Sequence, residues 1–267
     1  MTTQPTLFIP HGGGPCFFME WTRGPADTWD RMGAWLRGLA EELPERPKGI
    51  VVISGHWEEE AFTASAMARP GMIFDYSGFP PHTYELDYPA PGNPALAERV
   101  RQLLAAAGLP AAVSADRGFD HGVFVPFLLA FPDADIPVVP LSLRSNLDPE
   151  EHLAAGRALA ALRDEGILIV GSGMSYHNMQ GYSTPGAAGV SARFDDWLTA
   201  AVEADDPSER WRRLAHWEDS AEGRPSHPRE EHLLPLMVAA GAASAERGEK
   251  IFSDQVMVAT VSAFRFG

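Results

Sequence analysis

The chain has 267 residues, of which 45% are hydrophobic, so it is long enough and apolar enough to bury a sizeable core. Its formal net charge of -15 argues against nucleic-acid binding, because phosphate contacts require clustered Lys and Arg and only 21 such residues are scattered along the chain. The single cysteine, Cys16, forms no intramolecular disulfide, and neither a targeting segment nor the roughly 20 apolar residues of a membrane helix are found, so we expect a cytoplasmic protein without membrane or nucleic-acid partners.

The first predicted element is a strand that ends in a histidine. A short apolar run from Thr6 leads into His11 and three glycines, and its β-branched and aromatic residues are typical of a buried strand. The glycines allow the backbone to turn sharply directly after His11. Ligands of open α/β sheets bind at the carboxyl ends of the strands, so His11 is the first candidate site residue.

A helix and a second strand of the same kind follow. Apolar residues recur at three- and four-residue spacing within 26–43, which predicts an amphipathic helix. The β-branched run from Gly49 predicts a fully buried strand that again ends in Gly55 and His56. Two strands joined by a helix of crossover length lie parallel, so His11 and His56 should share one edge of the sheet.

The middle of the chain contains a long segment that is predicted to be irregular. Residues 72–94 are too rich in Gly, Pro and aromatic residues for regular structure, and loops of this length commonly form a lid or a pocket wall. His82, Tyr84, Asp87 and Tyr88 lie on it. The other expected elements are a strand at 61–67, a helix at 95–107, a strand at 111–114, a buried helix at 123–131, a strand at 136–143, a helix at 149–165 and a buried strand at 166–173.

In the C-terminal third of the chain, the sequence predicts helices followed by one or two final strands. Surface helices are expected at 189–204 and 207–217, an Ala-rich helix opens within 225–235, and residues 251–264 supply one or two strands. Pro235 falls inside the Ala-rich helix and removes a backbone hydrogen bond, so this helix should be irregular beside His232. Without an internal repeat or linker, one α/β domain over 1–267 is favoured.

Four histidines stand at strand ends or beside the irregular helix: His11, His56, His177 and His232. Histidine is the commonest protein metal ligand, and a site assembled from several elements needs scattered donors of this kind. A single histidine of this kind is more often a hydrogen-bonded structural residue than a metal ligand. Four of them at one predicted edge of the sheet favour a metal site. No HExxH or CxxC motif fixes two ligands locally, so spacing alone does not select the ligands.

Other motifs point to weaker alternatives. His11 and its glycines match the oxyanion loop of lipase-type hydrolases, but the required G-x-S-x-G elbow is absent, which disfavours serine hydrolysis. No Walker or G-x-G-x-x-G motif indicates a nucleotide. Cys16 is more simply a small buried residue than a nucleophile. Asp120, beside His121 in a glycine-bounded turn, is a candidate to orient an imidazole.

Seven segments, in the same order across nearly the whole chain, then resemble one family. They read HGGGP (11–15), SGHW (54–57), FPPHTYELDYPAPGNPALA (79–97), GFDHG (118–122), PDADIPVVPLSL (132–143), GSGMSYHN (171–178) and HPREEHLLPL (227–236). Together they are similar to the class III extradiol ring-cleavage dioxygenases, the LigB-like family, and more narrowly to its DOPA 4,5-dioxygenase branch.

The resemblance implies a single α/β domain with a central mixed sheet flanked by helices and a mononuclear non-haem metal at the C-terminal ends of the strands. Position by position, His11, His56 and His232 match the metal ligands and His177 matches the acid/base, with a fourth-ligand role for His177 left open. His121 looks like a substrate-pocket residue, and Tyr84 is a second candidate for substrate binding. Related enzymes use a carboxylate as third ligand, which keeps Glu231 open as an alternative to His232.

The implied reaction inserts O2 into a catechol-type ring, such as that of DOPA, and opens it. Fe(II) is the metal expected for activity, and Zn(II) competes well enough for imidazole donors to occupy the site on purification. The alternative is a catalytically inactive metal-binding or interaction protein on the same scaffold. The catechol used, the bond cleaved and assembly into a homo-oligomer are left open, while Arg23, Arg117 and Arg144 are candidates to neutralise a carboxylated substrate.

Overall fold

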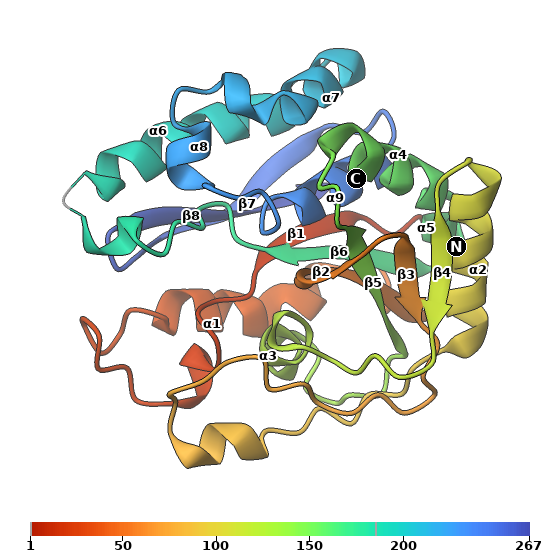
Figure 1. Ribbon diagram of the computed structural model, residues 1–267, viewed down its shortest axis with the longest axis horizontal. Helices are drawn as coiled ribbons and strands as arrows, with labels where there is room; N and C mark the ends of the chain where they lie inside the picture. The colour runs from red at the N-terminus through yellow and green to blue at the C-terminus, as the bar shows by residue number, and fades with distance from the viewer. Residues whose placement is uncertain (1, 185) are drawn as a thin grey trace.

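A computed structural model describes residues 2–184 and 186–267, and within these ranges eight strands form one mixed sheet in the order β4-β3-β5-β2-β6-β1-β8-β7 (Figure 1). The strands are β1 (Thr6–Pro10), β2 (Gly49–Glu59), β3 (Phe62–Ser65), β4 (Ala111–Ser114), β5 (Val138–Arg144), β6 (Ile167–Gly173), β7 (Gly248–Val256) and β8 (Ala259–Phe266). The prediction of an α/β fold with a central mixed sheet flanked by helices is confirmed.

Helices connect the strands and cover both faces of the sheet. The α-helices are α1 (Asp30–Gly38), α2 (Pro94–Ala106), α3 (His121–Ala130), α4 (Pro149–Leu159), α5 (Ala161–Asp164), α6 (Ala187–Val202), α7 (Pro207–Ala215), α8 (Gly223–Ser226) and α9 (Leu234–Ala242). Short 3-10 helices are η1 (Cys16–Phe18), η2 (Leu39–Glu42), η3 (Pro81–Glu85), η4 (Gly181–Ser183) and η5 (Trp217–Asp219). None of the helices in the described ranges combines the length and the apolar content that a bilayer crossing requires.

The parallel centre of the sheet brings the histidine-bearing strands together. β6 pairs in parallel with β1 on one side and with β2 on the other. The three strands therefore end at the same edge, as expected for β1 and β2, although β6 lies between them. The sheet becomes antiparallel where β3 meets β5, where β1 meets β8 and in the closing β7-β8 hairpin.

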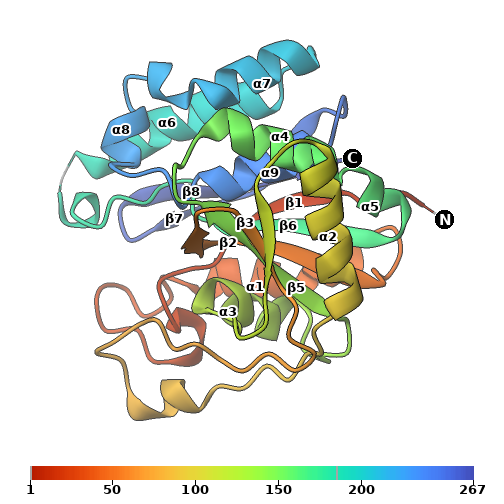
Figure 2. The ribbon, with the colours of Figure 1, turned by 45° about the vertical axis from the view of Figure 1, so that its right-hand side comes forward.

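Alternating side chains on the central strands build two cores. Phe8 of β1 and Val51 of β2 enter the core that α2, α4 and α9 cover. Their neighbours Leu7 and Ile50 enter the core on the other face, under α1 and α3. Figure 2 shows α1 and α3 on one side of the sheet and α4 and α9 on the other. This burial of both faces explains why the strands read as continuous apolar runs.

Side-chain caps fix where two of the helices start. The Asn93 side chain accepts a hydrogen bond from the Leu96 amide, and Asp148 accepts bonds from the amides of the first turn of α4. Proline follows each cap at the first helical position, where its missing N–H is not needed.

Three boundaries near the site differ from expectation. β2 continues past His56 to Glu59, and α3 already begins at His121. The prediction that Pro235 falls inside a helix is wrong, because α9 begins at Leu234 and Pro235 lies in its first turn. His232 accordingly lies in the irregular segment that precedes α9.

Candidate metal centre

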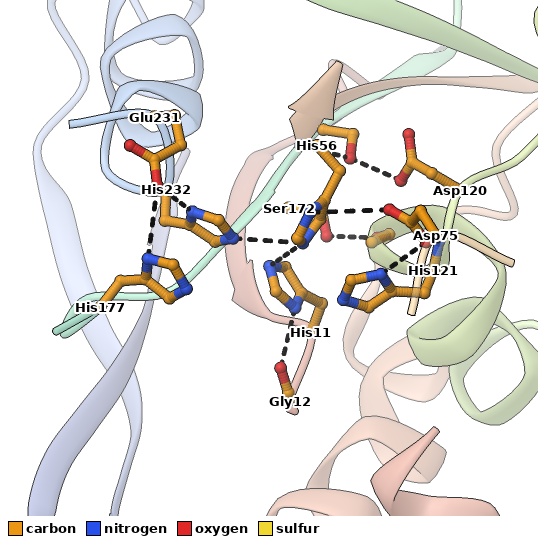
Figure 3. Close-up of polar contacts among 12 residues, drawn as sticks. His11, Gly12, His56, Asp75, Asp120, His121, Ser172, His177, Glu231 and His232 are labelled. Carbon is orange, nitrogen blue, oxygen red and sulfur yellow. Dashed lines mark hydrogen bonds and ion pairs between the residues drawn. The ribbon is translucent and has the colours of Figure 1, made fainter. Parts of the chain in front are cut away.

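Three histidine side chains from different parts of the chain meet at the carboxyl edge of the sheet (Figure 3). His11 directly follows β1, His56 lies in β2, and His232 precedes α9. The Nε2 atom of His56 is 3.3 Å from Nε2 of His11 and 3.1 Å from Nε2 of His232. Donor atoms from three separate elements therefore face one point.

A distortion of β2 directs His56 toward this point. The register of β2 against β5 shifts between Ile53 and Glu58, and shifts of this kind bend a strand and re-aim its side chains. Within the distortion, Ser54 Oγ accepts a hydrogen bond from the His56 amide at 3.2 Å and donates one to Asp120 at 2.7 Å. The buried Asp120 carboxylate thus supports the bend that carries the histidine.

Glycines let the segment that carries His232 lie directly on the sheet. A Cβ atom at Gly173 would be 2.1 Å from the His232 carbonyl oxygen, and one at Gly55 would be 3.3 Å from the His232 Cα. The Met174 amide donates to that same carbonyl oxygen at 3.0 Å. Gly55 within β2 and Gly173 at the end of β6 therefore provide the close backbone approach that places His232 opposite His56.

The second nitrogen of each ring faces an acceptor. Nδ1 of His11 is 2.9 Å from the Gly12 carbonyl oxygen, Nδ1 of His232 is 2.9 Å from Glu231 Oε1, and Nδ1 of His56 is 3.6 Å from Asp75 Oδ2. A proton on each Nδ1 leaves the Nε2 lone pair free, as metal-binding histidines require. We therefore assign the same tautomer to all three rings.

The electrostatics of the three rings favour the metal-binding form. Burial lowers the pKa of His11 and of His56 well below the usual value, and repulsion from the neighbouring histidines lowers both further. Burial also lowers the pKa of His232 to about 4, although the Glu231 carboxylate opposes the shift. Three neutral rings with converging lone pairs repel one another, and a bound cation would relieve this repulsion, so the residues fit a metal ion.

His177 lies beside this group. Its ring stacks on that of His232, and its Nδ1 is 3.4 Å from Glu231 Oε1. Glu231 thus serves both Nδ1 atoms and lies on the side of His232 away from the converging Nε2 atoms. Burial opposes ionisation of Glu231, but the hydrogen bonds to His177 and His232 outweigh it and hold the pKa of this carboxyl well below its usual range.

His121 approaches the group from the other side, at the start of α3. Its ring centroid is 3.9 Å from that of His56 and 5.3 Å from that of His11. Asp75 Oδ1 is 2.7 Å from Nδ1 of His121 and accepts a hydrogen bond from its backbone amide at 3.1 Å. Asp75 therefore holds His121 with one oxygen while the other faces His56.

The expectation that Asp120 orients an imidazole is wrong. Its carboxylate accepts hydrogen bonds from Ser54 and from Arg117, each at 2.7 Å. Asp75 occupies that role instead. It lies on the long loop, and no local signal distinguishes it there, because the same loop carries a second Asp-Tyr pair at Asp87 and Tyr88.

A cavity of about 590 Å³ opens onto the histidines, and His11, His56, His121, His177 and His232 all line it. Gly12–Gly14 and a group of mainly apolar side chains form the rest of the lining, namely Trp21, Arg23, Trp29, Tyr76, Phe79, Met174, Met179, Tyr182 and Met257. Such a mixture of an apolar wall and a few converging polar groups is typical of a small-molecule site.

Tyr84 is not among the residues that line the cavity. Its ring packs 5.3 Å from that of Tyr76, and its hydroxyl accepts a hydrogen bond from the Phe79 amide at 3.4 Å. Tyr76 lines the cavity, and its hydroxyl donates to the Thr83 carbonyl oxygen at 2.6 Å. Sequence reasoning missed Tyr76, which presents a fixed ring at the position anticipated for Tyr84.

Three remaining sequence candidates are not among the described residues that line the cavity. Arg144 pairs with Glu151, and Arg117 pairs with Asp120. Cys16 is buried beneath the glycine loop, where its sulfur accepts a hydrogen bond from the Gly13 amide at 3.3 Å. Burial raises the pKa of the Cys16 thiol, which suits a packing role and not a nucleophile.

The chain is similar to known proteins over most of its length. Residues 5–265 match the family described as the catalytic LigB subunit of aromatic ring-opening dioxygenase. The chain is 42% identical over 245 residues to a 4,5-DOPA dioxygenase extradiol of Beta vulgaris, with 89% of this chain and 86% of that protein covered. A protein of the same name from Escherichia coli (strain K12) is 39% identical over 252 residues, with coverage of 90% and 86%.

A fungal relative and a solved structure extend the likeness to the full length. Dioxygenase tasH of Hapsidospora irregularis is 36% identical over 289 residues, which span 100% of this chain and 86% of that protein. The crystal structure of an uncharacterized protein from Escherichia coli K12 superposes with a TM-score of 0.77 at 32% identity, covering 99% of this chain and 100% of the other.

Proposed function

Because this chain belongs to the LigB family of aromatic ring-opening dioxygenases, we propose that it is a metal-dependent extradiol dioxygenase that opens a catechol-type ring with O2. The observation that supports this most directly is the convergence of three histidine Nε2 atoms at a cavity that two further histidines also line. The proposal takes the chain, residues 1–267, as one catalytic domain.

We assign His11, His56 and His232 as the metal ligands. The expected metal is Fe(II), and Zn(II) is expected to compete for the same imidazoles. Glu231 is not assigned as a ligand, because its carboxylate faces the Nδ1 atoms and not the converging Nε2 atoms. When bound, the metal supplies a Lewis acid that favours catechol ionisation and a path for electrons from the catechol to O2.

His177 is assigned as the acid/base. Its Nδ1 faces Glu231, which leaves Nε2 to remove a proton from a catechol hydroxyl and to return it when the ring opens. The neighbouring carboxylate stabilises the positive charge that the ring acquires while it holds the proton. Glu231 therefore acts as a positioning residue for both His177 and His232.

His121 and the aromatic wall are assigned to substrate binding. Asp75 contacts both the ring Nδ1 and the backbone amide of His121, so this imidazole can hold a substrate oxygen in one orientation. Tyr76 contributes the ring against which a planar catechol packs, with Tyr84 supporting it from behind.

The test is ring opening by protein that is loaded with Fe(II) under anaerobic conditions. Air is then admitted in the presence of a panel of catechols that includes DOPA and protocatechuate. We expect a yellow ring-opened product and consumption of O2, and we expect Zn(II)-loaded protein to give neither. Retained iron with no colour across the panel would instead support a catalytically inactive metal-binding protein on this scaffold.

A further inference from the structure

We propose that Arg23 determines substrate specificity and that the cavity selects catechols whose side chain carries a carboxylate but no ammonium group. The inference rests on the proposed ring-opening function and names the substrate class within it. It follows from the charges of the cavity lining, from the position of Arg23 and from the charge of the whole molecule.

Arg23 is the one permanently charged side chain among the described residues that line the cavity. The lining contains no Asp, Glu or Lys within the same set of residues. The guanidinium lies over the Phe79 ring, 5.8 Å from its centroid, and within the described ranges no carboxylate is within ion-pair distance of it. Arg23 therefore differs from Arg117, which Asp120 neutralises.

A continuous series of rings leads from Arg23 to the metal centre. The Phe79 centroid is 5.4 Å from that of Tyr76, which is 5.8 Å from that of His121. His121 in turn lies 3.9 Å from His56. A catechol that packs along this wall with its hydroxyls at the histidines directs a substituent on the far side of its ring toward Arg23.

The charge of the molecule makes this cation necessary for an anionic substrate. The net charge of -15 repels carboxylates from a distance, so binding of an anion requires local compensation. Arg23 is an exposed residue of the lining, so its guanidinium faces both the cavity and solvent. A carboxylate that pairs with it gains a charge-assisted hydrogen bond that water partly screens.

An ammonium group gains nothing comparable. The described lining offers it no carboxylate, so the cost of removing its water shell is not offset, and Arg23 repels it. We therefore expect dihydrocaffeate, which is DOPA without its amino group, to be preferred over DOPA, and dopamine, which carries only the ammonium, to be the poorest of the three.

The experiment separates this inference from the proposed function by measuring binding as well as turnover. Calorimetry on Zn(II)-loaded protein gives the Kd of dihydrocaffeate and of methylcatechol without ring opening, and kcat/KM is then measured on Fe(II)-loaded protein. The variants are Arg23→Gln, Arg23→Lys and the charge-matched control Arg99→Gln. The control removes an arginine on α2 that pairs with Glu165.

Arg23→Gln should lower the preference for dihydrocaffeate over methylcatechol by about 2- to 5-fold in both measurements, as expected for an ion pair made by an exposed side chain. Arg23→Lys should keep part of the preference for dihydrocaffeate over methylcatechol, and Arg99→Gln should show the same preference as the wild type. An equal loss for both ligands, or wild-type preference for DOPA over dihydrocaffeate, would overturn the inference even if ring opening is confirmed. A charge-dependent Kd without turnover of any catechol would uphold the Arg23 assignment while refuting the proposed reaction.

Discussion

The imidazole of His177 lies flat on that of His232, with ring centroids 3.4 Å apart and ring planes 16° apart. The two rings also share one acceptor, because Glu231 Oε1 is 2.9 Å from Nδ1 of His232 and 3.4 Å from Nδ1 of His177. The residue assigned to proton transfer is thus held by a proposed ligand and by the ligand's own acceptor. The position of His177 therefore depends on His232 and Glu231. The three proposed metal ligands, by contrast, converge without any contribution from the His177 side chain.

This asymmetry predicts that His177→Ala retains iron but loses turnover. Removal of one acid/base group should lower kcat by about 100- to 10,000-fold. His56→Ala, by contrast, removes one of the three converging Nε2 atoms and should lose both iron and activity. Iron content of the purified proteins and the rate of ring opening provide the measurement. Full activity of iron-loaded His177→Ala would refute the acid/base assignment.

Asp75→Asn tests the carboxylate that serves His121 and His56. Asparagine keeps the size of the side chain but removes the charge that faces His56 Nδ1 at 3.6 Å. Loss of such an acceptor usually costs about 10- to 100-fold in metal affinity or activity, and we expect a loss in this range. Competition with a chelator measures the affinity. Asp87→Asn changes an exposed carboxylate of the same loop, and an equal loss in that variant would argue against a specific role for Asp75.

The sequence predicted the edge of the sheet at which the site lies, because local signals mark it. The runs that end at His11 and His56 are apolar and glycine-terminated, and both lie in or directly after parallel strands. That β6 separates β1 from β2 could not be predicted, since strand order depends on contacts between distant segments. Pro235 was misplaced because Glu230, Glu231 and Leu233 are good helix formers that precede the true start of α9, so no residue type marks where the helix begins.

The supporting residues of the site were harder to predict than the histidines. Asp75 and Tyr76 lie in a loop without periodicity, so their contacts with His121 arise only from the folded path of that loop. Asp120 lies directly beside His121 in the sequence but faces Ser54 in space, which shows how adjacency misled the assignment. The chemical roles of the histidines stay predictions, which the variants of His177 and His56 test.

Stability should fall between neutral and mildly acidic pH because of His152. This fully buried ring accepts a hydrogen bond from the Arg144 amide at 3.2 Å, and burial lowers its pKa to about 4. The unfolded chain takes up this proton near pH 6.5, so acid favours unfolding until the folded protein also binds it near pH 4. The free energy of unfolding should drop by about 2 kcal/mol from about pH 7 to about pH 5 through this residue.

Urea unfolding of His152→Gln at both pH values measures that contribution. Glutamine keeps a donor and an acceptor but does not titrate. The drop in unfolding free energy between the two pH values should therefore be about 2 kcal/mol smaller in this variant than in the wild type. Leu153→Ala removes buried apolar contacts from the same helix and should lower stability equally at both values. A wild-type pH dependence in His152→Gln would show that other groups carry it.

Gly173→Ala tests whether the end of β6 places His232. An added Cβ would be 2.1 Å from the His232 carbonyl oxygen, and a backbone atom cannot be displaced as cheaply as the end of a side chain. The segment before α9 must then move, so we expect a loss of about 1–3 kcal/mol in unfolding free energy and weaker metal binding. Gly38→Ala is the control, because a Cβ there meets nothing within 4 Å. If Gly173→Ala binds metal as tightly as the wild type, the contact between β6 and the His232 backbone does not position this ligand.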